Sequence, residues 1–132
     1  MTLEFFMPMV PPNATAQMHQ VKCRDGRPVF FDPPRVLATK SKLTAHLAGH
    51  VPEERYEGAV RLVTKWCWPC GMKHRDGEWK ITSPDTDNLI KALKDCMTRL
   101  GFWNDDAQVA SEITEKFWAD VPGIYVAIEE LA

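Results

Sequence analysis

The stretch SPDTDNLIKALKDCMTRLGFWNDDAQV, residues 83 to 109, carries the clearest pattern in the chain. Its apolar residues recur at helical spacing and therefore predict an amphipathic helix. The members of this apolar stripe are Leu89, Ile90, Leu93, Met97 and Leu100. Pro84 marks the start of the helix, and Gly101 is the type of residue that ends one.

Five aspartates belong to the same stretch: Asp85, Asp87, Asp95, Asp105 and Asp106. Steps of four residues place Asp87, Lys91 and Asp95 on one polar face of the helix, opposite the apolar stripe. We expect the turn at Gly101 to return the last two aspartates toward that helix. Clustered carboxylates repel one another unless a cation lies among them, either a hard divalent metal ion or the ammonium of Lys91.

An ordinary structural explanation of these aspartates stays open. Acidic residues are favoured in the first turn of a helix, Asp is a good N-cap, and residues four apart form ion pairs such as Asp87 with Lys91. Two metal motifs are excluded. An EF-hand loop would need an oxygen ligand at Leu89 and a glycine at Ile90. A phosphatase-type Asp-x-Asp should follow a buried apolar strand, whereas residues 79 to 84 are mostly polar.

Three submotifs in this order carry a resemblance to a known family. They are PDTDNL at 84–89, KA at 91–92 followed by Asp95, and GFWNDDAQV at 101–109. The chain thereby resembles the RusA family of Holliday-junction endonucleases. The early PMVPPN at 8–13 is also similar to the family's proline-rich first loop, so the likeness covers most of the chain.

The resemblance implies a function and a set of site residues. It implies a small homodimeric enzyme of DNA recombination and repair, often prophage-borne, that uses Mg²⁺ to cut four-way DNA junctions by paired symmetric nicks, with Mn²⁺ as a substitute. The family's essential carboxylates fall on Asp85, Asp87 and Asp106, which would be the metal ligands, and its essential lysine on Lys91. Asp95 and Asp105 are candidates for orienting Lys91 or a metal ligand, and Asn88 for capping or for holding a carboxylate.

Length, composition and charge limit the architectures that the chain can form. With 132 residues, of which 45% are hydrophobic and 26% charged, the chain is expected to form a single domain over residues 1–132. We find no apolar run long enough to span a bilayer and expect a soluble, cytoplasmic protein. The net charge is −2, but residues 1 to 80 carry 12 Lys/Arg against 8 Asp/Glu, and the remainder 4 against 10. This division predicts basic surface in the first part and an acidic site in the second.

The order of elements predicts an α+β fold. A strand near residues 3–7 precedes a helix from Arg35 to about His50, and the alternating residues from Val60 to Trp68 form the clearest strand. After the helix of the motif, we expect a strand to Trp118, a turn at 121–123, and a last strand that pairs back as a hairpin. Two helices on one face of a four-stranded mixed sheet would bury these stripes.

Basic residues outside the motif are candidates for DNA contact. The segment from His19 to Arg27 could form a hairpin-like arm that reaches DNA phosphates, although a solvated loop is the common fate of such a run. The same two interpretations apply to the helix residues Arg35, Lys42 and His46. They also apply to the loop 69–80, which adds Lys73, His74, Arg75, Trp79 and Lys80.

The pair Cys67 and Cys70 has the spacing of zinc ligands. A site could be completed by His74, or by His19 and Cys23, but four scattered reduced thiols are the simpler interpretation. Cys96 is expected to be a small core residue.

Two other functions remain alternatives to a nuclease. One is a DNA-binding module without catalysis, and the other is a resolvase-like scaffold that has lost its activity.

Overall fold

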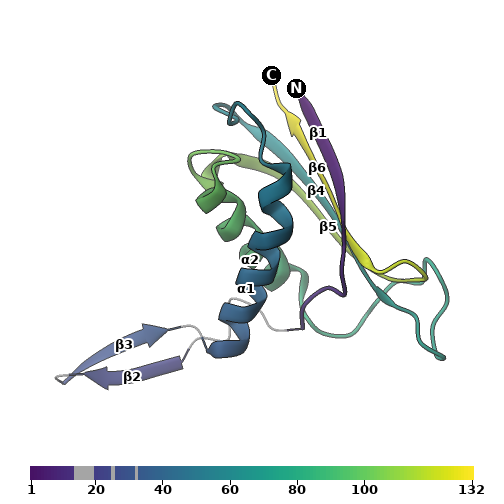
Figure 1. Cartoon of the computed structure of the whole chain (residues 1–132), viewed down its shortest axis with the longest axis horizontal. Coiled ribbons are helices and arrows are strands. Elements are labelled where there is room, and N and C mark those ends of the chain that lie inside the picture. The colour runs from purple at the N-terminus through teal and green to yellow at the C-terminus, as the bar shows by residue number, and fades with distance from the viewer. Residues whose placement is uncertain (14–19, 25, 32) are drawn as a thin grey trace.

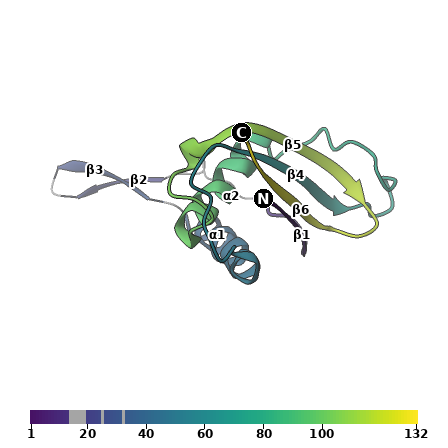
Figure 2. The same ribbon diagram turned by 90° about the horizontal axis from the view of Figure 1, so that it is seen from above.

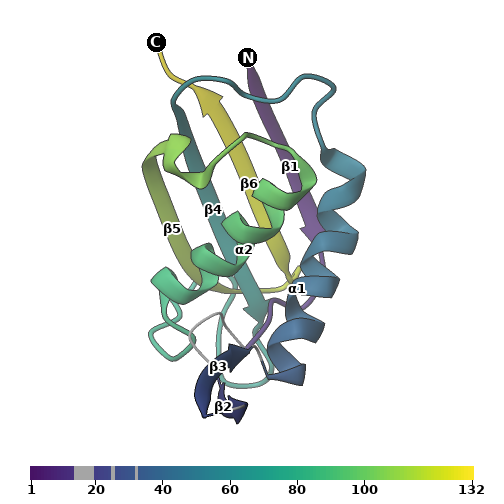
Figure 3. The same ribbon diagram turned by 90° about the vertical axis from the view of Figure 1, so that its left-hand side faces the viewer.

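Four strands form one sheet, and two helices cover one of its faces (Figures 1 and 3). The structure, a computed structural model, describes residues 1–13, 20–24, 26–31 and 33–132. The strands of this sheet are β1 (Thr2–Pro8), β4 (Val60–Pro69), β5 (Val109–Ala119) and β6 (Gly123–Glu130). The helices are α1 (Pro34–Leu47) and α2 (Thr86–Leu100), and the short 3-10 helices are η1 (Ala48–His50) and η2 (Asp106–Gln108). The α+β architecture predicted from the sequence is confirmed.

The sheet is mixed, with the order β1-β6-β4-β5. β4 and β5 run parallel to each other, as expected for two strands joined through the helix α2, whereas β6 is antiparallel to both β1 and β4. The predicted helix from Arg35 to about His50 is also present, as α1 followed directly by η1.

The prediction that the last two strands form a hairpin is wrong. β6 pairs with β4 and β1, so β4 lies between β5 and β6. The burial of the strands explains this arrangement. β4 alternates buried residues along its length and takes a central position, whereas β5 carries exposed or half-buried charges at Glu112, Glu115 and Lys116 and suits an edge.

The core lies between the sheet and the two helices. The helix-facing residues of β4 are all buried: Val60, Leu62, Thr64, Trp66 and Trp68. They pack with the apolar stripe of α2, in which Leu89, Leu93 and Met97 are at most 1% exposed. Burial of such a side chain stabilises the fold by about 1.5–3 kcal/mol. The stripe therefore fixes which face of α2 points away from the sheet and carries Asp87 and Lys91, both of which are exposed.

A second, two-stranded sheet projects from the body of the molecule. β2 (Gln20–Arg24) and β3 (Arg27–Phe31) pair as an antiparallel hairpin, which we call the arm. The arm extends away from the sheet on the side where the helices lie (Figures 1 and 2). In the part of the chain that the structure describes, no helix is long and apolar enough to cross a membrane.

Candidate active site

Asp85 and Asp87 lie at the start of α2. Asp85 occupies the N-cap position with an extended backbone, but its carboxylate makes no capping hydrogen bond. Asp87 lies in the first turn, and its Oδ1 accepts a hydrogen bond from the backbone N–H of Asn88 at 3.0 Å. Both carboxylates are exposed. The capping explanation therefore fails for Asp85, the residue whose position in the helix suits it best.

Lys91 lies one turn further along the same face and is exposed. Across the described ranges it forms no ion pair with Asp87 or Asp95, although both are four residues away. Asp95 instead pairs with Lys40 of α1, with 3.5 Å between Nζ and Oδ2. Lys40 is only 9% exposed, and the carboxylate of Asp95 offsets part of the cost of burying its ammonium. Asp95 thus helps to join the two helices, and the ion-pair explanation of the polar face of α2 does not hold.

The turn after α2 holds Asp105 and Asp106. Gly101 ends the helix in a left-handed conformation with φ 89°, and the next two residues, Phe102 and Trp103, are fully buried. These two aromatic side chains anchor the turn in the core. The chain then emerges at Asn104, whose side chain accepts a hydrogen bond from Arg55 at 2.7 Å.

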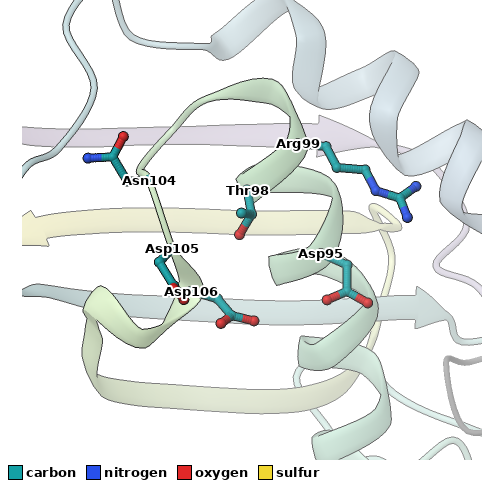
Figure 4. Close-up of a pocket in the computed structure, with 6 residues that line it drawn as sticks. All are labelled: Asp95, Thr98, Arg99, Asn104, Asp105 and Asp106. Atoms are coloured by element: carbon teal, nitrogen blue, oxygen red, sulfur yellow. The ribbon is translucent and has the colours of Figure 1, made fainter.

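The two neighbouring aspartates have different roles. Asp105 caps η2, because its Oδ1 accepts the Ala107 N–H at 2.9 Å while the side chain of Gln108 accepts the N–H of Asp105 at 3.1 Å. The carboxylate of Asp106 is exposed and forms no ion pair or hydrogen bond within the described part of the chain. Asp106 faces a depression of about 420 Å³, into which Asp95 also points from α2 (Figure 4).

Asp87 lines a different depression, of about 270 Å³, between the first turn of α2 and β5. Glu112 and Thr114 of β5 form its other wall. The hydroxyl of Thr114 and the side-chain oxygen of Asn88 are buried, and neither has a hydrogen-bond partner among the residues that the structure describes. Carboxylate, hydroxyl and amide oxygens, the donors that hard divalent cations prefer, thus occur together at the start of α2 and on the facing part of β5.

The predicted metal ligands are not gathered around one point. Among residues 1–13, 20–24, 26–31 and 33–132, no group of three or more His, Cys, Asp or Glu side chains is placed to hold a metal ion. The chemistry of Asp85, Asp87 and Asp106 fits Mg²⁺, since all three offer exposed carboxylate oxygens without a neutralising partner. Asp95, which shares the depression of Asp106, is eight residues beyond Asp87, or about 12 Å along the helix.

The basic candidates for DNA contact have different environments. Arg35 and Lys42 of α1, Lys73 and Arg75 of the loop, and Arg27 at the tip of the arm are exposed. His74 stacks on Trp118 with ring centroids 3.9 Å apart, and Lys80 is 7% exposed, so neither presents its side chain freely to DNA. His19 lies outside the described residues.

The cysteines of the pair Cys67 and Cys70 are free thiols. Burial, and then the nearby carboxylate of Asp76, raise the pKa of the Cys67 thiol, which opposes the thiolate form that zinc binds. Cys70 donates a hydrogen bond to Asp120 over 3.7 Å. Of the two proposed completions of a zinc site, His74 is engaged with Glu78 at 2.9 Å. Cys96 is buried, as predicted, with its thiol directed at the carbonyl of Lys40.

Sequence reasoning missed several residues around the site. Lys116 of β5 donates hydrogen bonds to the loop before Asp85, and Lys94 of α2 pairs with Glu112 at 3.0 Å. These contacts join positions 18 to 34 residues apart and depend on how α2 and the loop before it pack against β5, so no local pattern reports them.

Comparison with known proteins extends this description. A family model described as Endodeoxyribonuclease RusA matches residues 9–129. A crossover junction endodeoxyribonuclease of Lactococcus phage r1t is 32% identical over 111 residues, which cover 83% of each chain. The uncharacterized protein YqaN of Bacillus subtilis strain 168 is 27% identical over 120 residues, covering 83% of this chain and 84% of the relative.

Proposed function

Because the chain belongs to the endodeoxyribonuclease RusA family, we propose that it is a Mg²⁺-dependent homodimer that resolves four-way DNA junctions by paired, symmetric nicks. One observation carries this proposal. Asp85, Asp106 and Lys91 stay exposed and unpaired in the described structure, whereas Asp95 and Asp105, which neighbour them, are engaged in structural contacts. The side chains left free are those that a hydrolytic site for phosphodiesters requires.

The carboxylates would act as metal ligands. Asp85, Asp87 and Asp106 would hold one or two Mg²⁺ ions, with Mn²⁺ as a substitute. When bound, Mg²⁺ supplies an activated water and neutralises charge on the phosphate and on the leaving oxygen. The exposure of the three carboxylates leaves them open to DNA phosphates, which they would repel in the absence of a cation.

Lys91 would act on the transition state. Its exposed ammonium lies on the polar face of α2 and has no carboxylate partner in the described ranges, so no described carboxylate neutralises its charge. A free cation of this kind can stabilise the charge that develops on the phosphate during attack, or position the attacking water.

Substrate contacts would come from the basic first part of the chain. The arm carries Lys22, Arg24 and Arg27 and projects on the side of the sheet that α1 and α2 cover (Figure 1). Arg35 and Lys42 of α1 are exposed and add to the basic surface of this part of the chain. Such cations bind phosphates irrespective of sequence, which suits an enzyme that recognises the shape of a junction.

A homodimer follows from the symmetry of the substrate. Two opposed strands of a junction must be cut, and one site on one small domain cannot reach both, so a two-fold dimer matches the junction. Light scattering at micromolar concentration should report about twice the chain mass of 15.0 kDa. A strict monomer that still makes paired nicks would contradict the proposed assembly.

A cleavage assay tests the proposed activity. The protein is incubated with a synthetic four-way junction or a linear duplex, in Mg²⁺ or in EDTA, and the products are separated on a denaturing gel. We expect paired nicks in the junction with Mg²⁺ alone. Binding without nicking in every metal condition would favour a DNA-binding module or an inactive scaffold.

Asp85→Asn and Asp105→Asn make a matched pair for this assay. Both remove one carboxylate charge and keep the shape of the side chain. We expect Asp85→Asn to abolish nicking while junction affinity in EDTA holds, because the loss of negative charge beside phosphates cannot weaken electrostatic attraction. Asp105→Asn should nick normally, since Asn caps as well as Asp.

A further inference from the structure

Lys116 forms hydrogen bonds with the stretch of backbone that directly precedes Asp85 at the start of α2. Its ammonium donates hydrogen bonds to the carbonyl oxygens of Thr82 and Pro84, each at 2.7 Å. We propose that Lys116 is a positioning residue that fixes Asp85 for metal binding. This inference rests on the proposed function, and the residue itself touches neither metal nor DNA in the mechanism above.

Backbone pairing anchors the beginning of the loop before Asp85, and the buried Pro84 anchors its end, but the residues between them are held less firmly. Residues 77 to 80 run antiparallel along the free edge of β5, where three backbone hydrogen bonds of 2.8–3.0 Å join Gly77 and Glu78 to Trp118, and Lys80 to Lys116. Beyond Lys80 this pairing stops. Ile81 is 92% exposed, and Thr82 and Ser83 are exposed as well, so packing does not hold these residues in place.

Lys116 supplies the missing restraint. Its side chain lies on the helix side of β5, because its partner in the register, Trp66, faces the core. The two carbonyl groups that it binds lie on either side of Ser83. The second of them, from Pro84, belongs to the peptide group that includes the nitrogen of Asp85. The bond therefore fixes the peptide plane from which the Asp85 side chain extends.

A second lysine, Lys80, lies near the same loop but makes different contacts. Lys80 directs its ammonium at the Thr82 hydroxyl and over the ring of Trp118, 4.3 Å from the centroid. It is 7% exposed, and burial and then Lys116 lower its pKa. Lys80 thus fills the space under the loop, whereas Lys116 is the lysine whose bonds reach the residue next to Asp85.

The chemistry of these bonds favours a positioning role. Neither Lys80 nor Lys116 has a carboxylate partner within the described structure. The ammonium of Lys116 instead donates its hydrogen bonds to backbone carbonyls. Bonds from a charged donor are shorter and stronger than neutral ones. Residues that orient a metal ligand in this way typically change metal affinity or activity by roughly 10–100-fold when they are replaced.

Hydrogen–deuterium exchange tests the restraint without reference to activity. Lys116→Met keeps the length of the side chain and removes the ammonium. We expect faster exchange in peptides that cover residues 81–88 and unchanged exchange in β4 and β6. Lys65→Met is the matched control, because Lys65 lies on the neighbouring strand β4, on the opposite face of the sheet, and loses the same charge.

The nicking rate as a function of Mg²⁺ concentration tests the consequence for the site. Lys116→Met should raise the Mg²⁺ concentration at half-maximal rate by roughly tenfold or more, with junction affinity in EDTA close to that of Lys65→Met. Lys116→Arg should recover most of the metal dependence, since its guanidinium can donate to two carbonyl oxygens. A lysine that acts only through overall charge would give equal results for Lys116→Met and Lys65→Met.

The outcomes separate the inference from the proposed function. If Asp85→Asn is inactive and Lys116→Met matches the wild type in exchange and in Mg²⁺ dependence, the positioning role is overturned while the nuclease proposal stands. If Asp85→Asn nicks normally, the proposed site itself is wrong. Faster exchange at residues 81–88, together with the shifted Mg²⁺ dependence and rescue by Lys116→Arg, supports the positioning role.

Discussion

Asp105 and Asp106 are adjacent and chemically identical, yet their contacts predict opposite results on substitution. Asp105→Ala removes the side chain that caps η2 and accepts the Ala107 N–H, at a cost of about 1 kcal/mol. For 132 residues, an unfolding entropy of roughly 2.1 cal/mol/K per residue converts this loss to a fall in Tm of about 3–4 °C. We expect nicking to persist, because the carboxylate of Asp105 serves the backbone.

Asp106→Ala should show the reverse. The carboxylate of Asp106 accepts no hydrogen bond in the described structure and shares a depression with Asp95, so its removal relieves repulsion and leaves Tm unchanged or slightly higher. Nicking should be lost if this carboxylate holds Mg²⁺.

The assay is a thermal melt and a junction-cleavage time course for four variants, with Asn and Ala at each position. Asp105→Asn should behave as the wild type in both measurements, since Asn and Asp are similar caps. Wild-type nicking by Asp106→Asn, or loss of nicking in Asp105→Asn with an unchanged Tm, would refute this division of roles.

Three further predictions concern other parts of the molecule. Lys91→Ala should slow nicking by roughly two to three powers of ten with little loss of junction affinity, and Lys91→Arg should restore little; equal losses in rate and affinity would make Lys91 only a phosphate contact. The pKa of Lys80 is lowered by burial and Lys116, so between that pKa and the ordinary 10.5 the unfolded chain binds more protons and stability rises with pH. The thiols and phenols with raised pKa values, such as Cys67 and Tyr56, act in the opposite direction, so the test is a difference: from pH 7 to 10.5, Tm of the wild type should rise relative to Tm of Lys80→Met. Gly123→Ala places a methyl group against the ring of Phe6 and 2.7 Å from the Met7 carbonyl, which should destabilise by about 1–3 kcal/mol, whereas Gly58→Ala, with open space around it, should not.

The sequence predicted α2 well because the spacing of apolar residues within this one helix determines which of its side chains are buried. Leu89, Leu93 and Met97 are buried at the predicted spacing, and Gly101 ends the helix in the conformation that glycine favours. The alternation along β4 predicted its buried face for the same reason.

Local sequence patterns did not predict which distant strands pair with each other. Residues 109–119 and 123–130 have the short connection typical of a hairpin, but burial of β4 on its helix-facing side places it between them. The roles within the site depend on the same long-range contacts. Asp95 pairs with Lys40 because α1 packs on α2, and Lys116 reaches the carbonyl of Pro84 because the loop before α2 runs along the edge of β5.

The position of β6 in the sheet has a consequence for biosynthesis. β6 lies between β1 and β4, yet it is the last of the four strands to leave the ribosome. Until residues 123–130 emerge, β1 and β4 each expose a strand edge, and neither α1 nor α2 has a complete sheet to pack on. We therefore expect the nascent chain to fold late, because its sheet depends on contacts between residues that are distant in the sequence. We expect its unpaired edges to be open to chaperones during synthesis and a chain that stops before residue 123 to be prone to aggregation.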